Sequence, residues 1–162
     1  MHVLRLRLKT TETDKKEIDK RFRIVAHLHN VMVKEAIRRL NRLKQDSDYQ
    51  NAKETYKSVI SKQNRTADER RQLSEAKKTM KDCISRYSLK KNDFRFYLKV
   101  CGRQFKKSVS SQQVQVEAER VFKGVEKVLY KGGKRIHFKK QRDFSTIGGS
   151  SNVNYPRLKS QA

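Results

Sequence analysis

Apolar side chains recur every three or four residues over about thirty positions, and this spacing is the strongest constraint on how the chain can fold. The pattern runs from Thr13 or Asp14 to about Lys44. Its members are Ile18, Phe22, Val25, Leu28, Met32, Ala36, Leu40 and Leu43. Because an α-helix turns once every 3.6 residues, this spacing places all of them along one face. The sequence therefore predicts one long amphipathic helix.

A second pair of helices is expected next. One spans about Ser47 to Gln63, and another opens at Thr66, where Thr66 and Glu69 have the spacing of a capping box. Asn64 and Arg65 would then form the turn of a helical hairpin. Eight of the 17 acidic residues lie between Asp46 and Asp93. This hairpin is therefore interpreted as a spacer or packing element and not as a main phosphate contact.

The stretch from Asn92 to Lys107 interleaves aromatic and basic residues. Phe94, Phe96, Tyr97, Leu98 and Phe105 alternate with Arg95, Lys99, Arg103, Lys106 and Lys107. Such a pattern can stack on bases while holding a phosphate backbone. The favoured interpretation is a short helix that ends near Gly102 and buries its aromatics, because clustered Phe is usually buried.

A further long helix is expected from Ser110 or Ser111, with Gln113 at the capping-box position, to Gly132 and Gly133. Its apolar stripe comprises Val114, Ala118, Val121, Val125, Val128 and Leu129.

The two ends of the chain alternate like β-strands. Leu4, Leu6 and Leu8 alternate with Arg5, Arg7 and Lys9, and the run KRIHFKK followed by DFSTIGG comes after the last helix. The predicted fold class is α+β and predominantly helical, with four long helices inserted between short strands of an incomplete wedge-type barrel. The expected organisation is a first strand over 1–10, a helical lobe over 11–131, returning strands over 132–154 and a tail over 155–162.

The charge of the chain indicates its class of partner. The sequence holds 41 Lys and Arg against 17 Asp and Glu, a formal net charge of +24. A compact state must bear the self-repulsion of this charge, so a polyanionic partner is the simplest explanation. No apolar run approaches the length of a membrane span, so nucleic acid, as structured RNA or DNA, is preferred over a membrane. The predicted binding residues are Arg5, Arg7, Lys9, Arg103, Lys106, Lys107, Lys134, Arg135, Lys139, Lys140 and Arg142.

No catalytic or cofactor motif is apparent. Cys83 and Cys101 lie far apart and outside any CxxC pair, and they are interpreted as two small, independent thiols. Neither a GxSxG elbow nor a phosphate-binding glycine loop is present. A metal hydrolase needs several converging carboxylates, which nothing in the sequence assembles. We therefore expect no enzyme activity, no cofactor and no metal. The basic opening segment does not match a signal peptide, so a reducing cytoplasmic location is expected.

Several motifs, taken in order, carry a resemblance to a known family. FRIVAHLHNVMVKEA, with Phe22 and Asn30, is followed much later by SSQQVQVEAERVFKGVEKVL and RIHFKKQRDFSTIGGSSNVN. The matching positions in the last two runs are Gln113, Ala118, Arg120, Phe122, Phe138, Lys139, Phe144 and Ile147. In this order and spacing the chain, up to about Asn154, resembles the N-terminal region of the TnpB (OrfB) proteins of insertion sequences and of related type V CRISPR effectors.

The resemblance implies a recognition lobe and a wedge domain that hold guide RNA, heteroduplex and target DNA. The RuvC-like nuclease of that family, with its Asp, Glu, Asp set, lies C-terminal to the matched region and has no counterpart here. The implied function is the binding portion of such a nuclease, with any cutting supplied by a separate chain. The alternative is a stand-alone basic protein, such as a small repressor or an RNA-associated factor. Oligomeric state and the nucleic acid recognised stay open.

Overall fold

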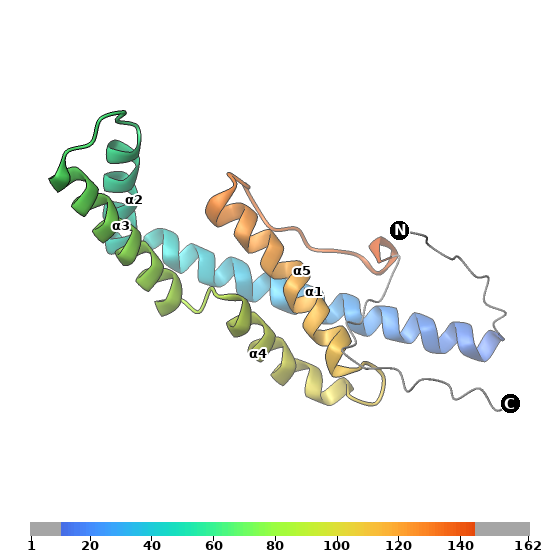
Figure 1. Cartoon of the computed structure of the whole chain (residues 1–162). Coiled ribbons are helices and arrows are strands. Elements are labelled where there is room, and N and C mark those ends of the chain that lie inside the picture. The colour runs from blue at the N-terminus through green and yellow to red at the C-terminus, as the bar shows by residue number, and fades with distance from the viewer. Residues whose placement is uncertain (1–10, 145–162) are drawn as a thin grey trace, which may run out of the picture.

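The computed structural model describes residues 11–144, and these residues form a helical body with a protruding arm (Figure 1). The elements are α1 Glu12–Gln45, α2 Ser47–Ile60, α3 Ala67–Arg86, α4 Lys91–Gly102 and α5 Ser111–Tyr130. Two short 3-10 helices complete the list. The first, η1 Arg103–Phe105, directly follows α4, and the second, η2 Gln141–Asp143, lies just before the end of the described chain.

Local sequence signals set the helix boundaries. Thr11, Thr66 and Ser110 each accept a hydrogen bond from a backbone N–H of the first turn at the start of α1, α3 and α5. The partner residues Asp14, Glu69 and Gln113 complete three capping boxes. The α5 helix ends where Gly132 takes a φ of +68°, and the Gly133 N–H donates to the Lys127 carbonyl over 2.8 Å.

The core lies where α5 packs against α4 and α1. Most of each predicted stripe is buried: Val25, Leu28, Met32, Ala36, Leu40 and Leu43 from α1 and Val114, Ala118, Val121 and Val125 from α5. At the ends of the stripes, Ile18 is 37% exposed, and Phe22, Val128 and Leu129 are half-buried. The α4 helix contributes Phe94 and Leu98, both fully buried. The expected burial of aromatics in this stretch is therefore confirmed for Phe94, whereas Phe96 is 70% exposed.

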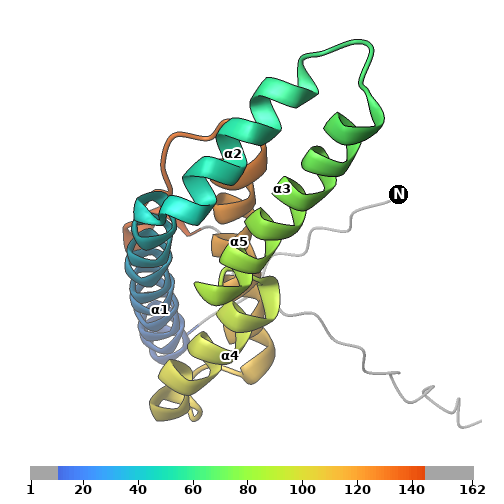
Figure 2. The ribbon, with the colours of Figure 1, turned by 90° about the vertical axis from the view of Figure 1, so that its left-hand side faces the viewer.

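The arm consists of α2 and α3, which pack chiefly against each other (Figure 2). The Arg65 guanidinium donates to the carbonyls of Val59 and Ile60 at the C-terminus of α2, over 3.0 and 2.6 Å. Ser88, whose φ of +53° lies in the left-handed region, forms part of the turn between α3 and α4. The predicted hairpin is thus present, but α2 ends at Ile60 and not at Gln63.

The α+β fold class is wrong for the described chain. Residues 11–144 contain no β-strand, whereas the four long helices and the short one expected to end near Gly102 are all present. The returning segment 132–140 has neither helix nor strand, because its neighbours are the flanks of α5 and α1 and not another strand. The proposed first strand over 1–10, the part of the returning strands after Phe144 and the tail lie outside the described residues.

Candidate nucleic-acid interface

Five of the predicted binding residues form two groups at opposite ends of α5, and Lys139, Lys140 and Arg142 lie further along the returning segment, next to α1. Arg103, Lys106 and Lys107 precede its N-terminus, whereas Lys134 and Arg135 follow its C-terminus, and all five are exposed. A helix of 20 residues is about 30 Å long, so the two groups are well separated. The third predicted group, Arg5, Arg7 and Lys9, lies outside the described residues. The expected single surface that joins this group to the C-terminal one stays a prediction.

The C-terminal group, Lys134 and Arg135, is carried by the segment 132–140. This segment folds back along α5, where the buried Ile136 packs on Gly124. A β-carbon at Gly124 would lie 3.2 Å from Ile136 Cγ2, so the missing side chain lets the segment approach the helix closely.

Asn30 of α1 then fixes the segment at a second point. Its amide nitrogen donates to the Lys139 carbonyl over 2.8 Å, and the Lys139 N–H donates to Asn30 Oδ1 over 2.9 Å. The carboxamide thus pairs with both backbone groups of Lys139, as a neighbouring strand would do. This explains how an extended segment is held without a sheet.

The end of the segment is anchored by aromatic packing. Phe144 is 7% exposed, and its ring meets the His29 ring edge-on at a centroid distance of 5.5 Å. The Lys139 ammonium lies over the Phe144 ring at 5.2 Å. Beneath this contact, the buried His29 Nδ1 lies 3.2 Å from the buried Glu117 Oε2, and Arg120 pairs with the same carboxylate. Side chains from α1, α5 and the returning segment therefore contact one another at this place and hold the three elements together.

The last two turns of α5 extend the charge of the returning segment. Lys123, Lys127 and Lys131 follow one another at four-residue steps and are all exposed. We call them, together with Lys134, Arg135, Lys139, Lys140 and Arg142, the C-terminal basic surface. The predicted site list missed these three lysines, of which Lys123 and Lys127 lie on α5 and Lys131 caps its C-terminus. Their spacing on the face away from Val121 and Val125 is the signal that could have found them.

The cations of this surface have no carboxylate partner within the described part of the chain. From Lys123 to Arg142 the chain holds eight Lys and Arg and one acidic residue, Glu126. None of the eight forms an ion pair with any residue between 11 and 144. A surface of this kind attracts phosphate groups strongly.

Two carboxylates elsewhere in the body, Glu35 and Glu119, are paired with arginines. Glu35 accepts from Arg38 over 2.7 Å and from Arg39 over 2.8 Å, and the hydrogen bond from Arg38 lowers the pKa of Glu35. Arg95 pairs with Glu119 and lowers its pKa in the same way. These two carboxylates are therefore already engaged by arginines of their own helices or neighbours and do not neutralise the eight cations.

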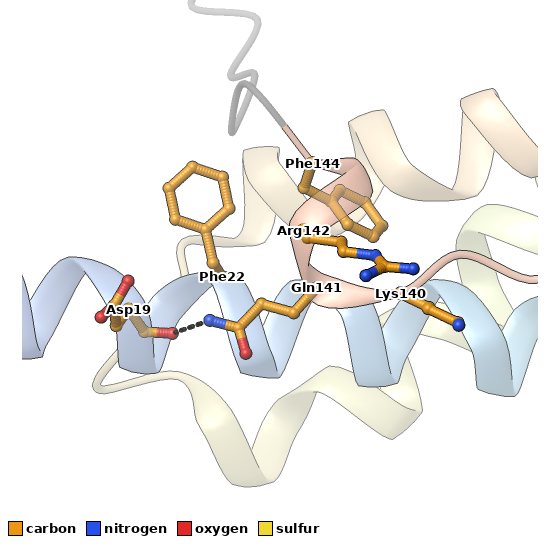
Figure 3. A pocket seen from close by; sticks show the side chains of 6 residues that line it. All are labelled: Asp19, Phe22, Lys140, Gln141, Arg142 and Phe144. Atoms are coloured by element: carbon orange, nitrogen blue, oxygen red, sulfur yellow. Dashed lines mark hydrogen bonds between the residues drawn. The ribbon is translucent and has the colours of Figure 1, made fainter.

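An open hollow of about 530 Å³ lies beside the basic surface, between α1 and η2 (Figure 3). Its walls are formed by Asp19, Phe22, Lys140, Gln141, Arg142 and Phe144. The Gln141 amide donates to the Asp19 carbonyl over 3.5 Å across one side of it (Figure 3). The hollow therefore combines two aromatic rings with two cations.

One group of side chains has the composition of a metal site. Asp46, Asp48 and Cys83 bring ligand atoms within 4.8 Å of one another at the base of the arm. Arg86 already contacts both carboxylates, at 3.1 and 3.2 Å, and the Tyr87 hydroxyl donates to Asp46 over 2.8 Å. Burial, reinforced by the Asp46 charge, raises the pKa of the Cys83 thiol. The group is an ion pair that joins α2 to α3, and a thiol held in its protonated form is a poor metal ligand.

Other features of the described chain bear on earlier expectations. Cys83 and Cys101 are both free thiols. None of the helices between residues 11 and 144 combines the length and the apolar character needed to cross a bilayer. No protein-family model, curated protein or solved structure matches this chain.

Proposed function

We propose that the chain binds nucleic acid through the C-terminal basic surface, with phosphate contacts supplying most of the affinity. The observation that carries this proposal is a set of eight cations from Lys123 to Arg142, which lie at one helix end and along one fixed segment and form no ion pair with any residue of 11–144. Neutralising a phosphate releases condensed counterions, which gives binding a steep dependence on salt.

Structured RNA or DNA associated with a TnpB-like or RNA-guided nuclease is the preferred partner. The resemblance to that family rested on residues at both ends of the helical region. Two pairs of them meet in space: Asn30 holds Lys139, and Phe22 and Phe144 line one hollow. This convergence supports the family interpretation of the helical part. A stand-alone RNA- or DNA-binding protein is the alternative.

The proposed role is binding without catalysis. The carboxylates of Glu35, Asp46, Glu117 and Glu119 are all engaged by arginine side chains. A two-metal hydrolase would need converging carboxylates free to hold cations. Any cleavage in the cell would then come from a separate nuclease chain.

The proposal is tested with a neutralised pair and a matched control. In Lys134→Gln/Arg135→Gln, two exposed cations are removed from the basic surface. The control, Lys78→Gln/Lys81→Gln, removes the same charge from exposed positions on α3. Filter binding to a structured RNA and to a DNA duplex, at several NaCl concentrations, gives the affinity and the salt slope.

We expect the first pair to weaken binding and to reduce the salt slope by about 1 for each lost phosphate contact. The control should change both much less. Affinity that does not depend on salt, or an equal loss in the control, would contradict the proposal. An incubation with Mg²⁺ or Mn²⁺ tests the second part, since cleavage by the purified chain would disprove a purely binding role. Preference for the RNA over the duplex would favour the guide-associated interpretation.

A further inference from the structure

Phe138 is a large apolar side chain that stays exposed within the basic surface. Its side chain is 56% exposed, although it lies only two residues after the buried Ile136. Single exposed apolar residues are ordinary on protein surfaces, so exposure alone says little. The surroundings of Phe138 are what distinguish it.

The backbone that carries Phe138 is held on both sides. Ile136 is packed against Gly124 on one side, and Lys139 is paired through its backbone with the Asn30 carboxamide on the other. The backbone of Phe138 is therefore fixed, with its side chain exposed, before any partner arrives. A fixed backbone loses less conformational freedom on binding than a mobile loop does.

The cations around Phe138 are also available. Lys134, Arg135 and Lys140 are exposed and have no ion-pair partner among residues 11–144. Phe96 on α4 is the informative contrast, since it is 70% exposed. Its neighbours Lys91 and Arg95 are both paired with Glu119. Phe138 therefore combines an exposed ring with several nearby cations that have no carboxylate partner among residues 11–144, whereas beside Phe96 only Lys99 is unpaired within that range.

This combination suits unpaired nucleotides. The faces of bases inside a duplex are covered by their neighbours, whereas a base in a single strand or loop offers its face to an aromatic side chain. Cations beside the ring would hold the adjoining phosphates. Resting on the proposed function, we infer that Phe138 is a stacking residue for an unpaired base, so that the basic surface binds single-stranded nucleic acid in preference to duplex.

The sequence contains no tryptophan, which allows a direct test in the full chain. Phe138→Trp introduces a single indole at the proposed stacking position, and Phe96→Trp introduces one at the control position. Each variant is titrated with a 15-nucleotide oligothymidylate and with a DNA duplex of the same length. We expect the oligothymidylate to quench the fluorescence of Phe138→Trp strongly, and the duplex to quench it weakly. The Phe96→Trp signal should change little with either probe.

Phe138→Ala provides the affinity measurement. Loss of one stacked base should weaken oligothymidylate binding by roughly 5- to 100-fold. Duplex affinity and the salt slope should stay the same, because no phosphate contact is removed. The melting temperature should also stay the same, since the ring is mostly exposed, and Phe96→Ala should bind like the parent chain.

The outcomes separate this inference from the proposed function. If Phe138→Ala binds the oligothymidylate normally while Lys134→Gln/Arg135→Gln does not, the stacking role is overturned and phosphate binding stands. Equal quenching by duplex and single strand would also overturn it. If Phe138→Ala instead abolishes self-association of the free chain in sedimentation, the ring serves a second copy of the protein and the inference fails. If neither the charge pair nor Phe138 affects binding, the proposed function itself is wrong.

Discussion

At the scale of single residues, Asp46 joins the start of α2 to the end of α3 through one carboxylate. It accepts hydrogen bonds from the Tyr49 N–H over 2.9 Å and from the Tyr87 hydroxyl over 2.8 Å, and Arg86 contacts it at 3.1 Å. The backbone bond from Tyr49, together with Tyr87 and Arg86, lowers the pKa of Asp46. All of these interactions favour the charged carboxylate in the folded state.

This lowered pKa predicts how stability depends on pH. A carboxylate whose pKa is lower in the folded than in the unfolded state stabilises the fold above the unfolded pKa, and the contribution is lost as the pH falls through the folded value. Asp46→Asn, which can still cap α2, should therefore be less stable than the parent chain at about pH 6, and the difference should shrink towards about pH 3. Urea unfolding at both pH values measures it. A difference that is constant with pH would show that the charge of Asp46 is unimportant.

The returning segment is the element that depends most on a single side chain. Asn30→Ala removes both hydrogen bonds to Lys139 and leaves its N–H and carbonyl without their protein partner. We expect a loss of about 1–3 kcal/mol in the free energy of unfolding. The Lys139 amide should also exchange its hydrogen much faster. Asn41→Ala, at an exposed position of the same helix, is the control and should leave the exchange of Lys139 unchanged. Unaltered exchange in Asn30→Ala would mean that packing of Ile136 and Phe144 suffices to hold the segment.

At the scale of the whole molecule, charge opposes folding and favours binding. The net charge is +24, and it is unevenly placed: the arm, from Ser47 to Arg86, has ten Lys and Arg against six acidic residues, whereas Lys123 to Arg142 has eight against one. Salt screens both repulsion within the fold and attraction to a polyanion. Raising NaCl from about 50 mM to about 500 mM should therefore raise the melting temperature of the free chain while weakening its binding to nucleic acid.

Thermal melts with and without a nucleic acid test this opposition. At low salt a bound polyanion should raise the melting temperature, because a ligand of the folded state stabilises it by mass action. At high salt that increment should vanish. A melting temperature that falls with added NaCl would contradict the view that self-repulsion limits the stability of this fold.

The sequence by itself determined the helices, because their signals are local. Apolar spacing identified the buried faces of α1 and α5, and the capping residues Thr66 and Ser110 marked two helix starts. It also determined the excess of positive charge and its concentration after Gly102. The conformation of the returning segment was decided by tertiary structure. Its alternating pattern predicted a strand, which was wrong, because a strand needs a partner strand and the groups that hold Lys139 come instead from Asn30, 109 positions away.

The same reason limits what the sequence could say about the site. Whether a cation pairs with a carboxylate also depends on the tertiary structure. Arg95 and Arg135 have the same side chain, yet only Arg95 pairs with a carboxylate, that of Glu119, which is 24 positions further along the chain. Arg135 has no carboxylate partner within the described residues. Which cations remain available for phosphate therefore depends on where folding brings the carboxylates, and no local pattern records that.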